Sequence, residues 1–267
     1  MEVKKNMAIN KVSVKGYVNE EPKFMMTERG PRMEIVIEID RREEIGKIEF
    51  LTVITEKREI IARLLKDELH PGDFFVGDCV LHTFNYQKEQ KFVCPHCHAQ
   101  VVGLKKAEIM NVDIIDYNVF YDQLDYAHKG ENAVILRGTL IDNPKTRTVT
   151  SGTQTRTYTK FKLRVKRDNQ PGGMVQENDY PFVVVFGNLA EETVSKLKKG
   201  DKVLITGSVQ ERTYFKVFDG MVCPECNYEV SPRINSYTRE VIVRNIELLH
   251  TSGSPSYRKP NKIQAKQ

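Results

Sequence analysis

The sequence predicts an all-β protein built as two tandem five-stranded barrels. Three observations lead to this prediction: a repeat at a constant offset of 122 residues, matching alternation of apolar and polar residues in both halves, and one short helical stretch per half. The chain of 267 residues is long enough for two modules, each with its own hydrophobic core.

The repeat opens each half, at Ile9 to Pro22 and at Ala133 to Pro144. Apolar residues alternate with polar ones in both segments, which predicts a half-buried strand. The fixed points, each pair 122 residues apart, are Asn10 and Asn132, Gly16 and Gly138, and Pro22 and Pro144.

The next strand of each half has one face that we expect to be buried. The inward residues are Ile35, Ile37 and Ile39 in the first half and Phe161, Leu163 and Val165 in the second. The residues between them are largely acidic in the first half and basic in the second: Glu34, Val36, Glu38 and Asp40 against Lys160, Lys162, Arg164 and Lys166.

A third strand, a short helix and two further strands complete each half. The third strands are Phe50 to Ile54 and Phe182 to Phe186, and the helices are Arg58 to Leu65 and Leu189 to Leu197, ended by Gly72 and Gly200. The last strands are Phe74 to Leu81 and Ile109 to Ile115, then Val203 to Val209 and Val241 to Leu248. This order is that of the five-stranded OB barrel.

A Cys-x-x-Cys knuckle is inserted between the fourth and fifth strands of each half. Two thiolates at this spacing occupy adjacent corners of a zinc tetrahedron but leave the site incomplete. The second knuckle has no further Cys or His within its insertion. We therefore predict one structural zinc ion shared by Cys94, Cys97, Cys223 and Cys226.

Three alternatives to the shared zinc site remain open. In the first, Cys79, His82, His96 and His98 supply the ligands that complete a local site in the first half. In the second, two chains combine their knuckles in a dimer, and in the third the cysteines form a redox pair. Cys79 itself, in an apolar strand, is most simply a small core residue.

The composition favours a soluble intracellular protein. No apolar run approaches the roughly 20 residues of a membrane span, the start lacks a secretory apolar region, and paired cysteines suit metal binding in a reducing compartment. Residues 1–128 hold 18 Lys and Arg against 22 Asp and Glu, a balance of −4, whereas the remainder holds 23 against 14, a balance of +9. A nucleic-acid partner would therefore be held mainly by the second half.

The second half resembles bacterial-type single-stranded DNA-binding proteins. The resemblance covers about 115 residues, a span within the usual size of one domain, and is carried by Asn132 to Gly138, Pro144, Val183 to Glu191 and Leu197 to Gly207. The first half is similar only at Asn10 to Pro22, in its strand pattern and at the Gly72-Asp73 turn, so it is a diverged copy. The acidic tip of that family has no counterpart in the basic residues 251–267.

Single-strand binding requires cations along the phosphates and aromatic faces for the bases. The resemblance implies base-stacking positions at Tyr180, Phe186 and Tyr214, with Phe215 nearby. We expect Tyr180 and Tyr214 to be exposed, whereas Phe186 continues the apolar strand from Val183 to Val185 and is therefore expected in the core. The residues themselves add Arg147, Arg156, Tyr158, Lys160, Lys162, Arg164 and Lys166.

The acidic first half is expected to extend the site or to dock a protein partner. Its candidate cations are Lys15, Lys23, Arg29, Arg32, Arg41 and Arg42, and its candidate stacking residues are Phe84, Tyr86 and Phe92. We expect residues 1–116 to form this first module, 117–130 an aromatic connector across the seam, 131–250 the second module, and 251–267 a disordered basic tail.

The predicted function is single-stranded DNA binding in replication, recombination or repair, without catalysis, membrane association or a phosphate-cradling loop. The expected partners are single-stranded DNA, replication or recombination proteins and further copies of the chain. The expected location is the cytoplasm, or the host cytoplasm if the two-barrel form comes from a phage. The alternatives are a zinc-stapled interaction scaffold and a single-stranded RNA binder.

Overall fold

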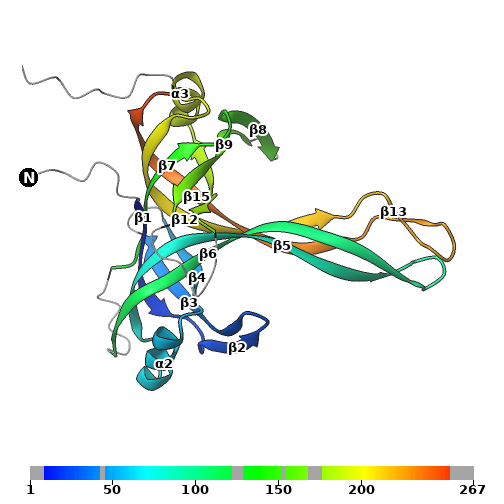
Figure 1. Cartoon of the computed structure of the whole chain (residues 1–267), viewed down its shortest axis with the longest axis horizontal. Coiled ribbons are helices and arrows are strands. Elements are labelled where there is room, and N and C mark those ends of the chain that lie inside the picture. Colours follow the sequence, from blue (N-terminus) through cyan, green and yellow to red (C-terminus); the bar gives the residue numbers. More distant parts are fainter. Residues whose placement is uncertain (1–8, 43–45, 122–128, 152–153, 168–175, 253–267) are drawn as a thin grey trace, which may run out of the picture.

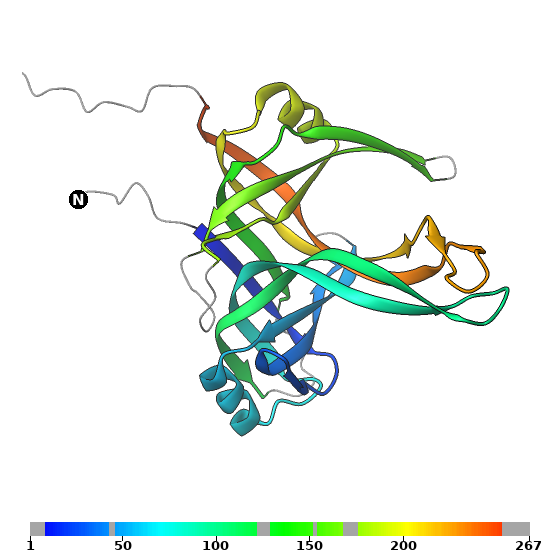
Figure 2. The same cartoon turned by 45° about the vertical axis from the view of Figure 1, so that its right-hand side comes forward.

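The structure is a computed structural model that describes residues 9–42, 46–121, 129–151, 154–167 and 176–252. Two barrels lie against each other, and a long hairpin arm projects from each of them toward the same side (Figure 1). Figure 2 shows the two arms running side by side toward their tips. Within the described residues, thirteen strands form one continuous sheet through both barrels.

The first barrel contains β1 (Ile9–Val18), β2 (Lys23–Thr27), β3 (Gly30–Arg41), β4 (Lys47–Thr55), α2 (Arg58–Asp67), β5 (Phe74–Val93) and β6 (Gln100–Phe120). β1 pairs with both β3 and β5, and β4 pairs in parallel with β6, so the ring closes in the order β1-β5-β6-β4-β3. This is the predicted OB order.

The second barrel contains β7 (Glu131–Leu140), β8 (Lys145–Ser151), β9 (Gln154–Lys166), β10 (Asn178–Asp179), β11 (Phe182–Phe186), α3 (Asn188–Lys196), β12 (Lys202–Val217), β13 (Met221–Val222), β14 (Glu229–Val230) and β15 (Arg233–His250). Its ring has the same connectivity, β7-β12-β15-β11-β9, closed by the pairing of β9 with β7. The prediction of two tandem OB barrels is confirmed.

The cores follow the predicted alternation. The inward residues of β3 and β9 are at most 2% exposed: Ile35, Ile37, Ile39, Phe161, Leu163 and Val165. Helix α2 buries Ile60, Ile61 and Leu64 on the same core and ends at a left-handed Glu68. Both helices lie where the sequence predicts them, within two residues at each end. No helix in the described ranges is long and apolar enough to cross a membrane.

The seam between the barrels is a strand pair. β1 and β7 pair antiparallel from Ile9 opposite Arg137 to Lys15 opposite Glu131, and Lys15 Nζ lies 2.5 Å from a Glu131 carboxylate oxygen. The repeated first strands therefore hydrogen-bond to each other, and this main-chain pairing joins the two barrels into one sheet.

The expectation that the aromatic connector packs across this seam is wrong for its first residues. Tyr117 belongs to β6, its ring stacks on Phe75 at 5.8 Å between centroids, and its hydroxyl donates to Asp67 at 2.6 Å. These contacts lie within the first barrel. Tyr126 and His128 lie outside the described residues, as does the basic tail from residue 253 onward.

The sequence pattern underestimates the lengths of the four strands that form the arms, β5, β6, β12 and β15. The strands predicted to end at Leu81 and Val209 extend to Val93 in β5 and to Val217 in β12. Their partners β6 and β15 also start earlier than predicted, at Gln100 and Arg233. Beyond the barrel both faces of a hairpin meet solvent or the other arm, so the apolar periodicity fades. Phe92, expected to stack on bases, instead contacts Phe218 of the other arm with ring centroids 5.0 Å apart.

Candidate nucleic-acid interface

The outer face of β9 gathers most of the residues predicted to bind nucleic acid. Side chains alternate along a strand, so residues at even spacing share the face opposite the core. In order along β9 this face carries Arg156, Tyr158, Lys160, Lys162, Arg164 and Lys166.

A row of three side chains crosses this face perpendicular to the strands. Tyr158 lies directly opposite Arg147 on β8 and directly opposite Phe186 on β11. The rings of Tyr158 and Phe186 are 6.0 Å apart between centroids and tilted by 47°. Arg147 is exposed, so the row offers one cation beside two aromatic rings.

The interpretation of Phe186 as a core residue is wrong, since its side chain is 46% exposed. Val183 and Val185 of the same strand are fully buried. Phe186 ends the strand before Gly187, whose positive φ of 64° turns the chain into α3. The ring therefore lies on the outer face beside Tyr158 rather than in the core.

Two of the predicted phosphate-binding lysines are engaged within the protein. Lys160 Nζ donates to Glu240 at 2.5 Å, and Lys162 forms an ion pair with Glu108 of the first barrel. Both ammonium groups also lie over the ring of Phe182, at 4.1 and 4.3 Å from its centroid. The sequence gives no sign of these carboxylates, because they come from β15 and β6.

Glu240 remains charged in this setting. Burial by itself raises the pKa of the carboxyl, but hydrogen bonds from Arg212 and Lys160 outweigh it and hold the pKa below its ordinary value. The carboxylate neutralises part of the basic face. The exposed cations of the face include Lys145 of β8, which is directly opposite Lys160, together with Arg147, Arg156, Arg164 and Lys166.

The remaining aromatic candidates lie at different places. Tyr214 and Phe215 are neighbours on β12 and so point to opposite faces; Phe215 is 71% exposed and Tyr214 is half-buried. Tyr180 is also half-buried, and its backbone N–H donates to Thr83 Oγ1 of the first barrel at 2.8 Å. One exposed aromatic that the sequence analysis missed is Tyr237, because it precedes the strand predicted to start at Val241.

Most candidate cations of the first module pair with carboxylates. The pairs are Lys15 with Glu131, Lys23 with Glu20, Arg32 with Glu34 and Glu56, Arg41 with Glu49, and Arg42 with Asp40. Arg29 differs: its guanidinium lies over the ring of Phe84, 5.1 Å from the centroid. Of the candidate cations that were expected to extend the nucleic-acid site along the first module, Arg29 is therefore the one not paired with a carboxylate among the ion pairs of the described residues.

The four knuckle cysteines meet at the arm tips. The Sγ atoms of Cys94 and Cys226 are 3.7 Å apart, those of Cys97 and Cys223 are 3.5 Å apart, and all four lie within 4.8 Å of one another. The knuckles share one backbone form, since His98 and Asn227, which follow the second cysteines, both have left-handed φ. Tetrahedral coordination by four thiolates matches this donor set.

The thiols interact strongly with one another. Burial opposes ionisation of Cys94, but backbone N–H groups of its own turn lower its pKa to about 7. For Cys226 a backbone N–H also lowers the pKa, yet burial and the neighbouring thiols raise it to about 12. Cys94 thus ionises readily. For Cys97, as for Cys226, a backbone N–H lowers the pKa but burial and neighbouring thiols raise it above the ordinary value, as expected of a cluster that a cation would complete.

Among the described residues, the ligand atoms that lie together are those of Cys94, Cys97, Cys223 and Cys226, so the local site with Cys79, His82, His96 or His98 is not assembled. Cys79 is 3% exposed in the barrel core, where burial raises the pKa of its thiol far above the ordinary value. His82 is buried nearby and its Nδ1 lies 2.7 Å from Asp113 Oδ2. Both residues lie at the barrel end of β5, whereas Cys94 lies at the arm tip.

Three comparisons with known proteins agree with this architecture. Residues 131–249 match the family model described as the Single-strand binding protein family. A single-stranded DNA-binding protein from Thermotoga maritima is 39% identical over 83 residues, which are 31% of this chain and 58% of that relative. The aligned region thus spans less than two thirds of the relative's length.

Crystal structures of the single-stranded DNA binding protein from Thermus aquaticus resemble the whole chain. The wild-type structure has a TM-score of 0.61 at 16% identity and covers 94% of this chain and 98% of that one. A deletion mutant has a TM-score of 0.59 at 17% identity, with 96% and 98% covered. At these identities the likeness concerns the fold, and the match to the family model covers the second barrel, residues 131–249.

Proposed function

We propose that this chain binds single-stranded DNA through the outer face of its second barrel. The observation that carries the proposal is the row of Arg147, Tyr158 and Phe186, in which a cation lies beside two solvent-accessible rings. Stacking of a base on an aromatic ring contributes about 1–3 kcal/mol and does not depend on sequence, and cations along β9 would follow the phosphates.

In this proposal the two barrels contribute unequally to DNA binding. The second barrel supplies Arg164 and Lys166 besides the row and should bind most tightly. In the first barrel, ion pairs occupy most of the candidate cations, so we expect a weaker extension of the site or a protein-docking role. The same activity would serve replication, recombination or repair in the cytoplasm, including a host cytoplasm if the chain is phage-encoded.

We further propose that the four-cysteine cluster holds one structural zinc ion. Cys94, Cys97, Cys223 and Cys226 come from both modules, and a closed set of four thiolates leaves no position for a reactive water. The role of the ion would be to join the arm tips, with no catalytic step. A redox role of the same cysteines is the alternative.

Fluorescence-anisotropy titration of labelled oligo-dT tests the DNA proposal. A Tyr158→Ala, Phe186→Ala variant should bind about tenfold or more weakly, given 1–3 kcal/mol per stacked base. Phe50→Ala is the control, because it removes an exposed ring from the first barrel. Wild-type protein that binds no polynucleotide would favour an interaction scaffold, and preferential binding of oligo-rU would favour an RNA role.

A further inference from the structure

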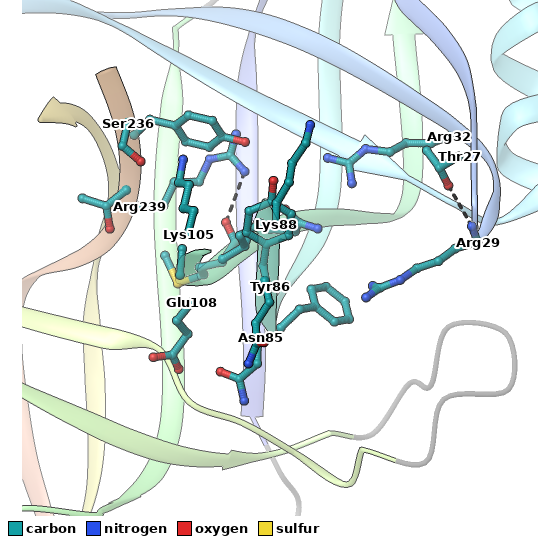
Figure 3. A pocket seen from close by; sticks show the side chains of 18 of the residues that line it. Thr27, Arg29, Arg32, Asn85, Tyr86, Lys88, Lys105, Glu108, Ser236 and Arg239 are labelled. Carbon is teal, nitrogen blue, oxygen red and sulfur yellow. Dashed lines mark hydrogen bonds between the residues drawn. The ribbon is translucent and has the colours of Figure 1, made fainter. Parts of the chain in front are cut away.

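Glu108 lies where the arm of the first module meets the second barrel. It lines one edge of a groove of about 830 Å³ that runs between Arg29 of the first module and Tyr237 of the second. Figure 3 shows its carboxylate pointing away from Lys105, the nearest labelled lysine of β6. The residue directly opposite Glu108 on β5 is the uncharged Asn85. The carboxylate forms its ion pair with a cation of the second module instead.

That cation is Lys162, on the outer face of β9. Its side chain is 24% exposed and that of Glu108 is 21% exposed, so the ion pair is half-buried and is screened less by salt than a surface pair. The Lys162 ammonium also lies 4.3 Å from the ring centroid of Phe182, the residue directly opposite it on β11. A carboxylate of the first module therefore occupies a cation of the proposed DNA-binding face.

The neighbouring Lys160 is held in a similar way, but by its own barrel. Its ammonium lies 4.1 Å from the centroid of the same Phe182 ring, and it donates to Glu240 at 2.5 Å. Two ammonium groups over one ring repel each other, so each is stabilised by a nearby anion. Glu240 and Glu108 supply these two negative charges.

The two carboxylates differ in how readily they can release their lysine. The side chain of Glu240 is 7% exposed, and it also accepts a hydrogen bond from Arg212 Nε at 3.2 Å. Removal of Lys160 would leave this buried carboxylate without one of its cations, which is costly. The side chain of Glu108 is more exposed, so water can solvate its carboxylate after the lysine has left. Glu108 is therefore the exchangeable counter-ion.

A phosphate group can take the place of the Glu108 carboxylate. Both groups carry one negative charge and accept hydrogen bonds through oxygen atoms, and the three N–H donors of an ammonium bind either one. The exchange requires no movement of the barrels. The pairing of β1 with β7 and the bond from the Thr83 backbone N–H to Asp179 Oδ1, at 2.7 Å, join the modules independently of Glu108.

We propose that Glu108 is an internal competitor of DNA phosphate, which holds Lys162 until a bound strand displaces it. The inference rests on the proposed function of the second barrel. It gives the first module a regulatory contact that lowers the affinity of the second barrel for single strands. Stable binding then requires contacts elsewhere on the face, such as the row of Tyr158 and Phe186, to offset the loss of the ion pair.

Glu108→Gln tests the inference in anisotropy titrations of labelled oligo-dT. The substitution keeps the size of the side chain and removes its charge, so a phosphate meets an unpaired Lys162. At about 50 mM salt the variant should bind about fivefold more tightly than wild type, since the strand no longer has to break an ion pair. The slope of log K against log salt should become steeper by up to about 0.7, the value for one phosphate contact on a single strand.

Two further variants separate exchange at Lys162 from a general effect of charge. Glu131→Gln is the matched control, because it makes the same change in net charge and breaks another ion pair between the modules, that with Lys15 at the seam. It should leave the affinity for oligo-dT unchanged. In a Lys162→Ala background, Glu108→Gln should have no effect on affinity, because the cation for which Glu108 competes is absent.

The outcomes distinguish this inference from the proposed function. Wild-type protein that binds no oligo-dT would refute the proposed function, and the inference with it. Wild-type protein that binds, together with a Glu108→Gln variant of equal or lower affinity, would overturn the inference alone. An equal gain in Glu131→Gln, or a gain from Glu108→Gln that persists without Lys162, would also overturn it, because either result would show an effect of net charge.

Discussion

The side-chain amide of Asn132 pairs with the backbone of Val209 in both directions: Nδ2 donates to the Val209 carbonyl at 2.7 Å, and the Val209 N–H donates to Oδ1 at 2.9 Å. Asn10 makes the same two bonds with Leu81, at 2.8 and 2.9 Å. In each barrel the backbone pairing of the first strand with its neighbour ends two residues away, at Val12 or Val134, and the asparagine side chain forms the next two hydrogen bonds to that neighbour. The repeated asparagines of the sequence are therefore structural.

Asn132→Ala should destabilise the protein. The substitution leaves the backbone groups of Val209 without partners in a buried position, which costs about 1–3 kcal/mol of unfolding free energy. Urea denaturation of the variant and of wild type measures the difference. Asn10→Ala should show a smaller loss, since its site is only part-buried, and an unchanged midpoint for Asn132→Ala would contradict the structural role.

Arg164→Ala and Lys166→Ala should weaken DNA binding mainly at low salt. Each cation that contacts a phosphate contributes about 0.7 to the slope of log K against log salt for single strands. Anisotropy titrations at several salt concentrations give the slope for each variant. Lys160→Ala is the comparison: because Lys160 pairs with Glu240, its removal should change the slope less than removal of Arg164.

Glu240 should make stability depend on acidic pH. Its pKa is lower folded than unfolded, so its contribution to stability is present above the unfolded value of about 4.3 and is lost as the pH falls through the folded value. Glu240→Gln should therefore lower the unfolding free energy by about 1–2 kcal/mol at neutral pH. Urea denaturation of both proteins should show that this difference shrinks below about pH 4, and a constant difference would refute the assignment.

Metal analysis of the purified protein should find one zinc ion per chain. Cys94→Ser or Cys223→Ser should abolish it, because either change removes one of four ligands, whereas Cys79→Ala should retain it. Removal of zinc by a chelator should increase hydrogen exchange at both arm tips together, since the buried cluster of Cys94, Val101, Cys223 and Val230 joins them. Two ions per chain would exclude a shared site.

The sequence by itself determined the elements whose signal is local. The 122-residue repeat and the period-two alternation of Ile35 to Ile39 and of Phe161 to Val165 predict two barrels, and the spacing within each knuckle predicts paired thiolates. The alternation and the knuckle spacing depend on neighbours two or three residues apart, which strand geometry and coordination chemistry constrain directly, and the repeat shows that the same local patterns occur twice.

The tertiary structure decided what depends on residues far apart in the chain. Lys160 and Lys162 are predicted to be phosphate ligands, yet carboxylates of β15 and β6 engage them. The exposure of Phe186, the joining of β1 to β7 and the groove between Arg29 and Tyr237 are likewise absent from any local pattern. Ion pairs between distant residues, the exposure of a strand end and the pairing of strands from different barrels all depend on which surfaces pack together. Only the folded chain specifies that packing.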